Sequence, residues 1–214
     1  MDNSNRGNWR GPRQDYGGRR PYRQDRGRPQ QPRRNPLPEG FSLFYVAVLC
    51  PGPIEQKVAG FKNYMHNNYG CRAAQKSPAH LTIIPPFRAE DELMSSLAGF
   101  VQTFNIGIVP FDVQLNGYGQ FGERVLYVHV PESESLNQLE KECMAEFESK
   151  FPSIIFGMKP DFNPHVTIAT RDIPEGRLAE ARAYFEQHHP ISEIFTVSEL
   201  KLLRLDKGWW NVIE

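Results

Sequence analysis

The sequence has 214 residues, of which 39% are hydrophobic, and this suits one well-packed domain of ordinary size with some chain left over. The formal net charge is zero, so the overall composition indicates neither a strongly basic nor a strongly acidic protein. The three cysteines (Cys50, Cys71 and Cys143) are widely spaced and form no Cys-x-x-Cys pair, which argues against a disulfide framework and against a zinc site.

Charge is distributed unevenly along the chain. Residues 1–38 hold ten Arg, no Lys and three Asp, whereas residues 39–214 hold 15 Lys and Arg against 22 Asp and Glu. The first segment is also rich in Gly, Pro, Gln and Asn and poor in aliphatic residues, so it cannot bury enough apolar surface to offset the entropy of ordering. We therefore expect a disordered Arg/Gly/Pro-rich tail over residues 1–38 and a folded domain over residues 39–214.

The tail has the composition of segments that contact RNA loosely. Arginines stand beside glycines, and Trp9, Tyr16 and Tyr22 are interleaved with them. Guanidinium groups can bind phosphates while aromatic rings stack on unpaired bases. We expect RNA contact by tail residues 1–38, sensitive to salt and poor in sequence preference. The alternative is a solvating, low-complexity tail without a specific partner.

The sequence carries no mark of a membrane protein. It lacks the apolar segment of a secretory signal, and no stretch approaches the roughly 18 apolar residues that a transmembrane helix needs. We expect a cytoplasmic protein that acts as a monomer and has no membrane partner.

From Phe41 onward, apolar runs alternate with amphipathic stretches, which is typical of strands and helices that follow one another. The pattern predicts strands near residues 42–49, 79–84, 111–117, 124–130, 165–170, 194–204 and 209–213. It predicts helices near residues 53–68, 89–104, 133–150 and 174–187.

Two stretches of the domain, residues 41–117 and 124–213, have the same order of elements. Each runs from a strand through a helix to a strand that carries His-x-Thr, then through a second helix to a closing strand. Such a repeat places equivalent positions opposite each other when the copies pack together. We therefore expect an α+β fold with two pseudo-symmetric lobes around a central cleft, each lobe an antiparallel sheet flanked by helices.

The two His-x-Thr sequences are the candidate catalytic site. Side chains alternate along a strand, so His80 and Thr82 share one face of their strand, and His165 and Thr167 repeat this arrangement. One neutral imidazole can take a proton while the other, protonated, donates one, which is what cleavage of a phosphodiester without metal requires. The threonine hydroxyls can donate hydrogen bonds to phosphate oxygens. The alternative is a pair of buried or incidental histidines.

Four further residues are candidates for substrate binding. Phe87 and Phe121 are expected in loops next to site strands, where they could stack on a base. Arg124 and Arg171 could contact phosphate, Arg171 because it follows the second motif strand. Ordinary packing for the rings and surface solvation for the arginines are the alternatives. No carboxylate joins the histidines in a metal-like spacing, and no Gly-rich nucleotide loop is present.

The segments SPAHLTIIPPF and NPHVTIATRDI, with FGERVLYVHV between them, resemble the 2H phosphoesterase superfamily. Within it they resemble the branch known as the 2′,5′ RNA ligase or RNA 2′,3′-cyclic phosphodiesterase family. The resemblance covers about residues 41–214 and excludes the tail. It implies a bilobed fold of two antiparallel sheets around a cleft, and catalysis by His80, Thr82, His165 and Thr167 with no metal or other cofactor.

The resemblance leaves the substrate open. Similar family members open 2′,3′-cyclic phosphates, cleave 2′,5′-linked oligonucleotides, or act on cyclic phosphates of ADP-ribose. We expect hydrolysis of RNA or a small nucleotide to dominate over ligation, because mass action in water favours hydrolysis. One rival hypothesis is a noncatalytic RNA-binding protein that uses the 2H-like domain and the Arg-Gly tail. Another is a small-molecule esterase for which the tail is irrelevant.

Overall fold

The computed structural model describes residues 37–156 and 161–214, so the predicted tail lies, except for its last two residues, outside the described residues. Residues Leu37–Glu214 form one compact unit. Its hydrophobic side chains form one continuous main core that extends through both repeat halves.

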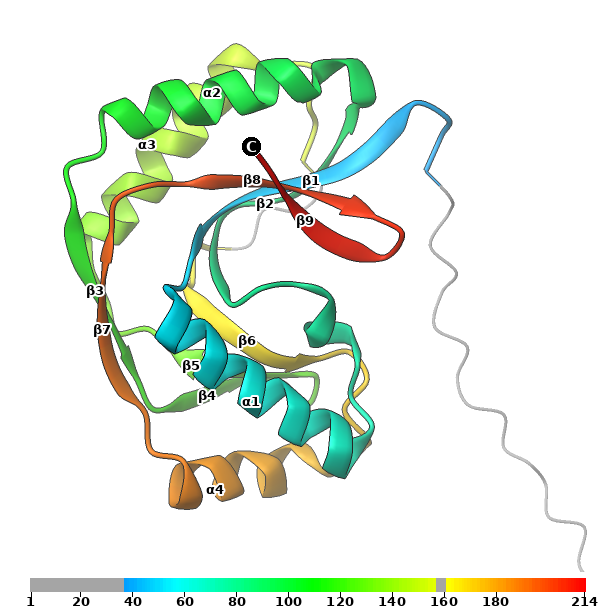
Figure 1. The fold of residues 1–214 in the computed structure, drawn as a ribbon, viewed down its shortest axis with the longest axis vertical. Coiled ribbons are helices and arrows are strands. Elements are labelled where there is room, and N and C mark those ends of the chain that lie inside the picture. Colours follow the sequence, from blue (N-terminus) through cyan, green and yellow to red (C-terminus); the bar gives the residue numbers. More distant parts are fainter. Residues whose placement is uncertain (1–36, 157–160) are drawn as a thin grey trace, which may run out of the picture. The chain divides into compact units, whose positions relative to one another are not determined.

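The described strands form three antiparallel sheets (Figure 1). The first sheet has the order β2 (His80–Glu90), β1 (Phe41–Leu49), β8 (Lys201–Asp206) and β9 (Trp209–Ile213). The second has the order β4 (Tyr118–Phe121), β5 (Val125–His129) and β6 (His165–Thr170). The third consists of β3 (Phe111–Asn116) paired with β7 (Ser192–Val197), the strands that close the two repeat halves.

Four α-helices connect these strands: α1 (Gly52–Tyr69), α2 (Met94–Ile106), α3 (Glu134–Lys150) and α4 (Leu178–His188). Short 3-10 turns, Ala73–Lys76 and Asp91–Leu93, precede β2 and α2. The backbone N–H of Leu136 donates to the Ser133 side chain, which caps α3 at its first turn. No helix among the described residues is both long and apolar enough to span a lipid bilayer.

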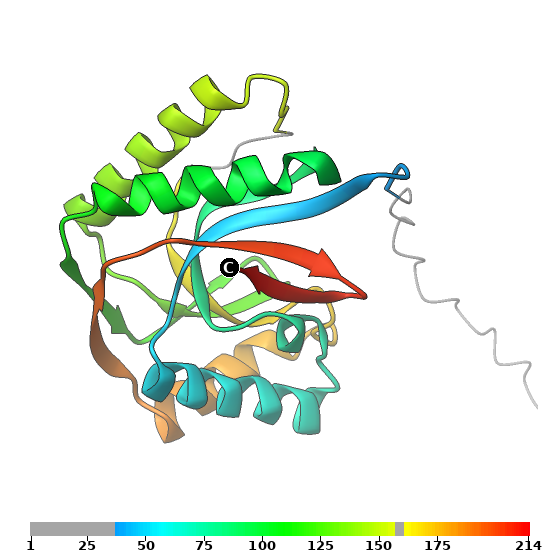
Figure 2. The same cartoon turned by 45° about the horizontal axis from the view of Figure 1, so that its top comes forward.

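The two repeat halves exchange their first helices. Helix α1 follows β1 in the chain but packs on β6, and α3 follows β5 but packs on β2. Helix α2 likewise contacts β8 of the second half, whereas α4 contacts β5 of its own half and β4, which lies between the halves. As a result α2 and α3 lie on one side of the molecule and α1 and α4 on the other (Figures 1 and 2). The predicted α+β fold of antiparallel sheets flanked by helices is confirmed, with the two halves interlocked.

Strand β2 is longer than predicted and carries two prolines. It continues past residue 84 to Glu90, and the pairing with β1 shifts in register near Pro85. Proline has no N–H to donate to a sheet, but β2 is an edge strand of its sheet and can accommodate it. The predicted helix at residues 89–104 consequently begins later, at Met94.

The single strand predicted over residues 194–204 is wrong, because the chain forms two strands there. β7 ends at Val197 and β8 begins at Lys201, and the two belong to different sheets. At the break, Leu200 is buried and its backbone bonds to a side chain from α2. The Leu200 N–H donates to Asn105 Oδ1 at 2.7 Å, and Asn105 Nδ2 donates to the Leu200 carbonyl at 3.0 Å. Strand β4 was not predicted.

Candidate active site

The structure brings the two His-x-Thr strands together. Strand β2 lies against β6. In each motif the histidine and threonine are partly exposed while the residues that alternate with them are buried. Thr82 and His165 line the same cavity, and the charge of His165 contributes to lowering the pKa of His80. The two motifs therefore face the same region of the molecule.

The ring of His80 is held by the segment that precedes β2 and by β1. Its Nδ1 lies 2.8 Å from the carbonyl oxygen of Pro78, which can only accept, so Nδ1 carries the proton and Nε2 is left for a substrate. The ring of Tyr45 stacks on the imidazole at 4.9 Å, and its hydroxyl lies 2.9 Å from Ser77 Oγ, itself 3.2 Å from Nδ1. Trp210 packs edge-on against Tyr45 at 4.5 Å between ring centroids.

The surroundings of His165 repeat this plan. Its Nδ1 donates to the carbonyl of Asn163 at 2.7 Å, again two residues earlier in the chain. The ring centroid of Tyr127, from the neighbouring strand, lies 5.0 Å from the imidazole. Phe121 contacts both, at 4.4 Å from Tyr127 and edge-on at 4.8 Å from His165. Both histidines thus present the same nitrogen to the site and contact a tyrosine ring from the neighbouring strand.

Burial lowers the pKa of both histidines. The pKa of His80 falls to about 4, first because the ring is buried and further because Lys62 and His165 are positive neighbours, while the hydrogen bond to Pro78 opposes the shift. The pKa of His165 is lowered by burial and raised in part by its bond to Asn163. Both rings are therefore largely neutral at pH 7 when the site is empty. A bound phosphate anion would raise both pKa values.

A cavity of about 540 Å³ adjoins His165 and Thr82. Its walls are mostly apolar, with Ile83, Phe121 and Met144 among the lining residues, and they also include the carboxylates of Glu140 and Asp161. This volume falls within the range of small-molecule sites, and apolar walls with a few polar groups suit a flat ring such as a nucleobase. The cavity therefore offers room for a nucleoside beside the histidine pair.

Of the two aromatic residues predicted to stack on a base, one lines the cavity and the other is buried in the core. Phe121 lines the cavity beside His165. Phe87 is only 2% exposed and packs against Phe44 and Phe147, so the expectation that it stacks on a base from a loop is wrong. The reason is the extension of β2 past its prolines, which carries Phe87 into the core.

The two predicted arginines lie beside each other, Arg124 just before β5 and Arg171 just after β6, at the end of this strand pair that is farther from His165. The N–H of Arg171 donates to the carbonyl of Arg124 at 2.9 Å, and both residues are exposed. Arg171 is six residues beyond His165, which corresponds to about 20 Å along an extended strand. That separation is too large for a phosphate held between the histidines, but a longer RNA could reach both arginines.

Residues that sequence reasoning did not assign to the site are Ser77, Tyr45, Tyr127 and Gly119. The tyrosines stand at matching places in the repeat, and that correspondence could have identified them as partners of the histidines. Gly119 lies opposite Tyr127 in the β4–β5 pairing, and a methyl group added there would overlap the Tyr127 ring. Only glycine leaves that ring its place beside His165.

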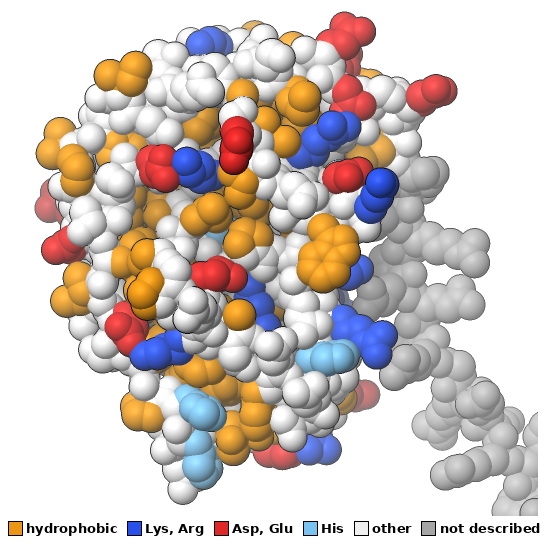
Figure 3. Space-filling model, in the orientation of Figure 1, with side chains coloured by type: hydrophobic (Ala, Val, Ile, Leu, Met, Phe, Trp, Pro, Cys, Tyr) orange, Lys and Arg blue, Asp and Glu red, His pale blue; other side chains and the backbone are white. Residues whose placement is uncertain are grey.

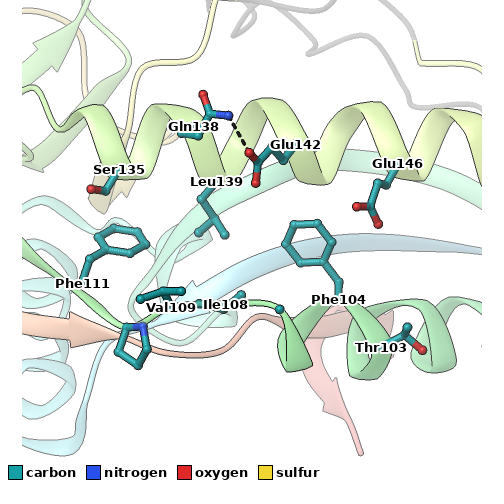
Figure 4. Close-up of a pocket in the computed structure, with 12 residues that line it drawn as sticks. Thr103, Phe104, Ile108, Val109, Phe111, Ser135, Gln138, Leu139, Glu142 and Glu146 are labelled. Carbon is teal, nitrogen blue, oxygen red and sulfur yellow. Dashed lines mark hydrogen bonds between the residues drawn. The ribbon is translucent and has the colours of Figure 1, made fainter.

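A second cavity, of about 610 Å³, lies between the end of α2, the segment before β3 and α3 (Figure 4). Phe104, Val109 and Leu139 line it together with the carboxylates of Glu142 and Glu146. Carboxylates line both cavities, but among the described residues no histidine lines this one. It is therefore a poor site for phosphoester chemistry.

Two further observations bear on ligands. On the face drawn in Figure 3, acidic and basic side chains are interspersed and do not gather into a patch of one sign. Within residues 37–156 and 161–214, no three His, Cys, Asp or Glu side chains are placed to hold a metal ion together.

Comparison with known proteins places the chain in a family. Residues 50–209 match the sequence model of the 2′-5′ RNA ligase superfamily. A Geobacillus kaustophilus protein, provisionally named a phosphoesterase, is 25% identical over 175 residues, which cover 79% of this chain and 93% of that protein. A Bacillus mycoides protein with the same provisional name is 28% identical over 178 residues, covering 79% of this chain and 92% of its own.

Solved structures share the fold at lower identity. TT0787 of Thermus thermophilus matches with a TM-score of 0.59 and 20% identity, covering 80% of this chain and 95% of that one. E. coli LigT complexed with 3′-AMP matches with a TM-score of 0.56 and 16% identity, covering 81% and 96%. Because the family's sequence model spans most of the described domain, the chain belongs to the 2′-5′ RNA ligase superfamily.

Proposed function

We propose that this protein is a phosphodiesterase that works without metal and hydrolyses a 2′,3′-cyclic phosphate or a 2′,5′ linkage in RNA or a small nucleotide. The observation that carries the proposal is the matched pair of imidazoles. His80 and His165 stand on adjoining strands, each with Nδ1 tied to a backbone carbonyl and Nε2 left for the substrate. Paired histidines of this kind supply both proton transfers of a phosphodiester hydrolysis.

The reaction needs one histidine neutral and the other protonated. The neutral Nε2 takes a proton from water, whose oxygen forms a bond to phosphorus as a P–O bond to the ribose breaks. The departing ribose oxygen receives its proton from the protonated imidazole, so the pair ends with its single proton on the other ring. The hydroxyls of Thr82 and Thr167 donate to the non-bridging phosphate oxygens, which carry the developing charge.

The surroundings of the pair support a nucleotide substrate. The apolar cavity with Phe121 in its wall has room for a base beside His165. The fold relative E. coli LigT has been solved with 3′-AMP. In a longer RNA, Arg124 and Arg171 contact phosphates further from the cleaved bond, and tail residues 1–38 add contacts that weaken with salt.

The test is hydrolysis of a short RNA that ends in a 2′,3′-cyclic phosphate, and separately of a 2′,5′-linked dinucleotide, both in EDTA. We expect turnover of at least one, and the position of the phosphate in the product shows which bond breaks. Loss of turnover on chelation would contradict a mechanism without metal. Binding of RNA with no turnover of either substrate would favour the noncatalytic RNA-binding alternative.

The pH dependence of kcat/KM should be bell-shaped with an acidic optimum. The active form carries one proton on the pair, so kcat/KM falls when pH drops through the pKa of His80, about 4, and the second ring protonates. It also falls when pH rises through the pKa of His165, which burial places below 6.5. We expect the maximum of kcat/KM between these limits.

The profile of kcat gives the matching control. Because the bound phosphate anion raises the pKa of the protonated ring, the alkaline limb of kcat should lie at higher pH than that of kcat/KM. Profiles of both quantities for the cyclic-phosphate RNA measure this. A kcat/KM that keeps rising above pH 7 would show that the histidines do not have the low pKa values described above.

A further inference from the structure

The side chain of Lys62, on α1, is buried beneath the segment that leads into His80. It is only 5% exposed, and burial lowers its pKa. Removing an ammonium group from water costs several kcal/mol, so it needs compensating partners. Its Nζ donates to the carbonyl of Ser77 at 2.8 Å, and the carboxylate of Glu55, seven residues earlier on the same helix, opposes the lowering of its pKa.

Helix α1 thereby holds residues 77–79 at two points. Lys62 binds the carbonyl of Ser77, and the Glu55 carboxylate accepts a hydrogen bond from the N–H of Ala79. Ser77 Oγ lies between the hydroxyl of Tyr45, at 2.9 Å, and Nδ1 of His80, at 3.2 Å. The position of the His80 ring therefore depends on residues 77–79, which hydrogen bonds to two side chains of α1 hold in place.

The other half of the repeat lacks this charge. Helices α1 and α3 begin at Gly52 and Glu134, and the same sequence offset separates Tyr45 from Tyr127. This offset aligns Lys62 with Met144. Three of the four buried residues of α3 align with buried residues of α1: Leu136 with Ile54, Cys143 with Phe61, and Phe147 with Met65. Met144 lines the cavity that adjoins His165, so one histidine has a buried cation nearby and the other a thioether.

The charged and titratable groups around Lys62 come from several elements. Glu55 lies on its own helix, Cys50 precedes that helix, and His80 lies on β2. On the far side of His80 stand Tyr45 and His165. Among these groups, Lys62 and His165 are the cations that disfavour a proton on His80.

We propose that Lys62 is a positioning residue for His80, fixing the 77–79 segment through Ser77 and, by its charge, adding to the burial that makes His80 the ring that accepts the proton while His165 donates it. The assignment of roles rests on the proposed function. The hydrogen bond and the charge are separate contributions of one side chain, and they can be removed separately.

Three variants separate them. Lys62→Met copies the other half of the repeat and removes both the donor and the charge, whereas Lys62→Gln removes the charge and keeps an N–H donor toward Ser77. Lys57→Met, on the same helix but exposed in an ion pair with Glu193, is the matched control. Lys62→Met leaves the Glu55 carboxylate without its cation, so this variant is expected to lose stability, and the folded fraction of each variant is measured beside its rate.

We expect Lys62→Met to lower kcat about 10-fold to 100-fold, with KM changed less than about threefold, because the acceptor ring is misplaced. Lys62→Gln should recover part of kcat. In both variants the NMR titration midpoint of the His80 ring, followed in the full chain without substrate, should rise by about one pH unit. Lys57→Met should match wild type in all three readouts.

The proposal is overturned if Lys62→Met matches Lys57→Met in kcat, or if the His80 midpoint does not move in either Lys62 variant. A fall in kcat explained entirely by a lower folded fraction, measured by circular dichroism, would also overturn it. Failure of the proposed function looks different: wild type would then hydrolyse neither substrate, while the His80 midpoints would still report whether Lys62 controls the charge of that ring.

Discussion

Replacing either site histidine by alanine, His80→Ala or His165→Ala, is expected to lower kcat for a 2′,3′-cyclic-phosphate RNA by about 10²-fold to 10⁴-fold. Each variant removes one of the two proton transfers. The double variant should be little worse than either single one, because the two rings act as a unit. Steady-state rates with a labelled RNA measure the effect.

The matched control is His188→Ala. His188 is exposed near the end of α4, where its Nδ1 contacts the Tyr184 carbonyl at 3.0 Å. Its loss should change kcat by less than about twofold, as is usual for surface positions. If His80→Ala or His165→Ala kept more than about a tenth of the wild-type kcat, general acid–base catalysis by that histidine would be ruled out.

The second large effect is expected from Gly119→Ala. The added methyl group overlaps the far end of the Tyr127 ring, which must move, and that ring contacts His165. We expect kcat to fall about 10-fold to 100-fold because a small displacement of a catalytic group is costly. Stability should fall by about 1–3 kcal/mol, as is usual for overpacking, because the Tyr127 ring is buried.

Gly99→Ala serves as its control. Gly99 lies inside α2, and a methyl group added there meets nothing within 4 Å. This variant should gain about 0.5–1 kcal/mol, the helix preference of alanine over glycine, with kcat unchanged. Thermal unfolding and kcat, measured together, distinguish the two. A Gly119→Ala protein with normal kcat would show that the place of Tyr127 does not matter to the reaction.

Much of the fold could be predicted because its pattern is local. The strand at residues 165–170 has the predicted bounds, and the helix predicted at 133–150 differs by one residue. Alternation along the strands also predicted which face carries each His-x-Thr pair. These features depend on neighbours in the sequence, whose periodicity can be read directly.

The errors came from contacts distant in sequence. The break before β8 depends on Asn105, which takes the place of a strand partner for Leu200. The burial of Phe87 depends on β2 being an edge strand, which permits Pro85 and Pro86 within it. No short window of sequence contains either fact. The same holds for Lys62, whose role depends on where α1 meets the segment before β2.

The central pairing of the first sheet has a consequence for how the protein is made. Phe44 in β1 pairs with Arg204 in β8, although nearly the whole domain separates them in the chain. During synthesis β1 must therefore wait with one edge unpaired until β8 has left the ribosome, and contacts of such long range form slowly. Unpaired apolar strands are prone to associate with other chains, so a nascent chain stalled before β8 is a natural client for chaperones.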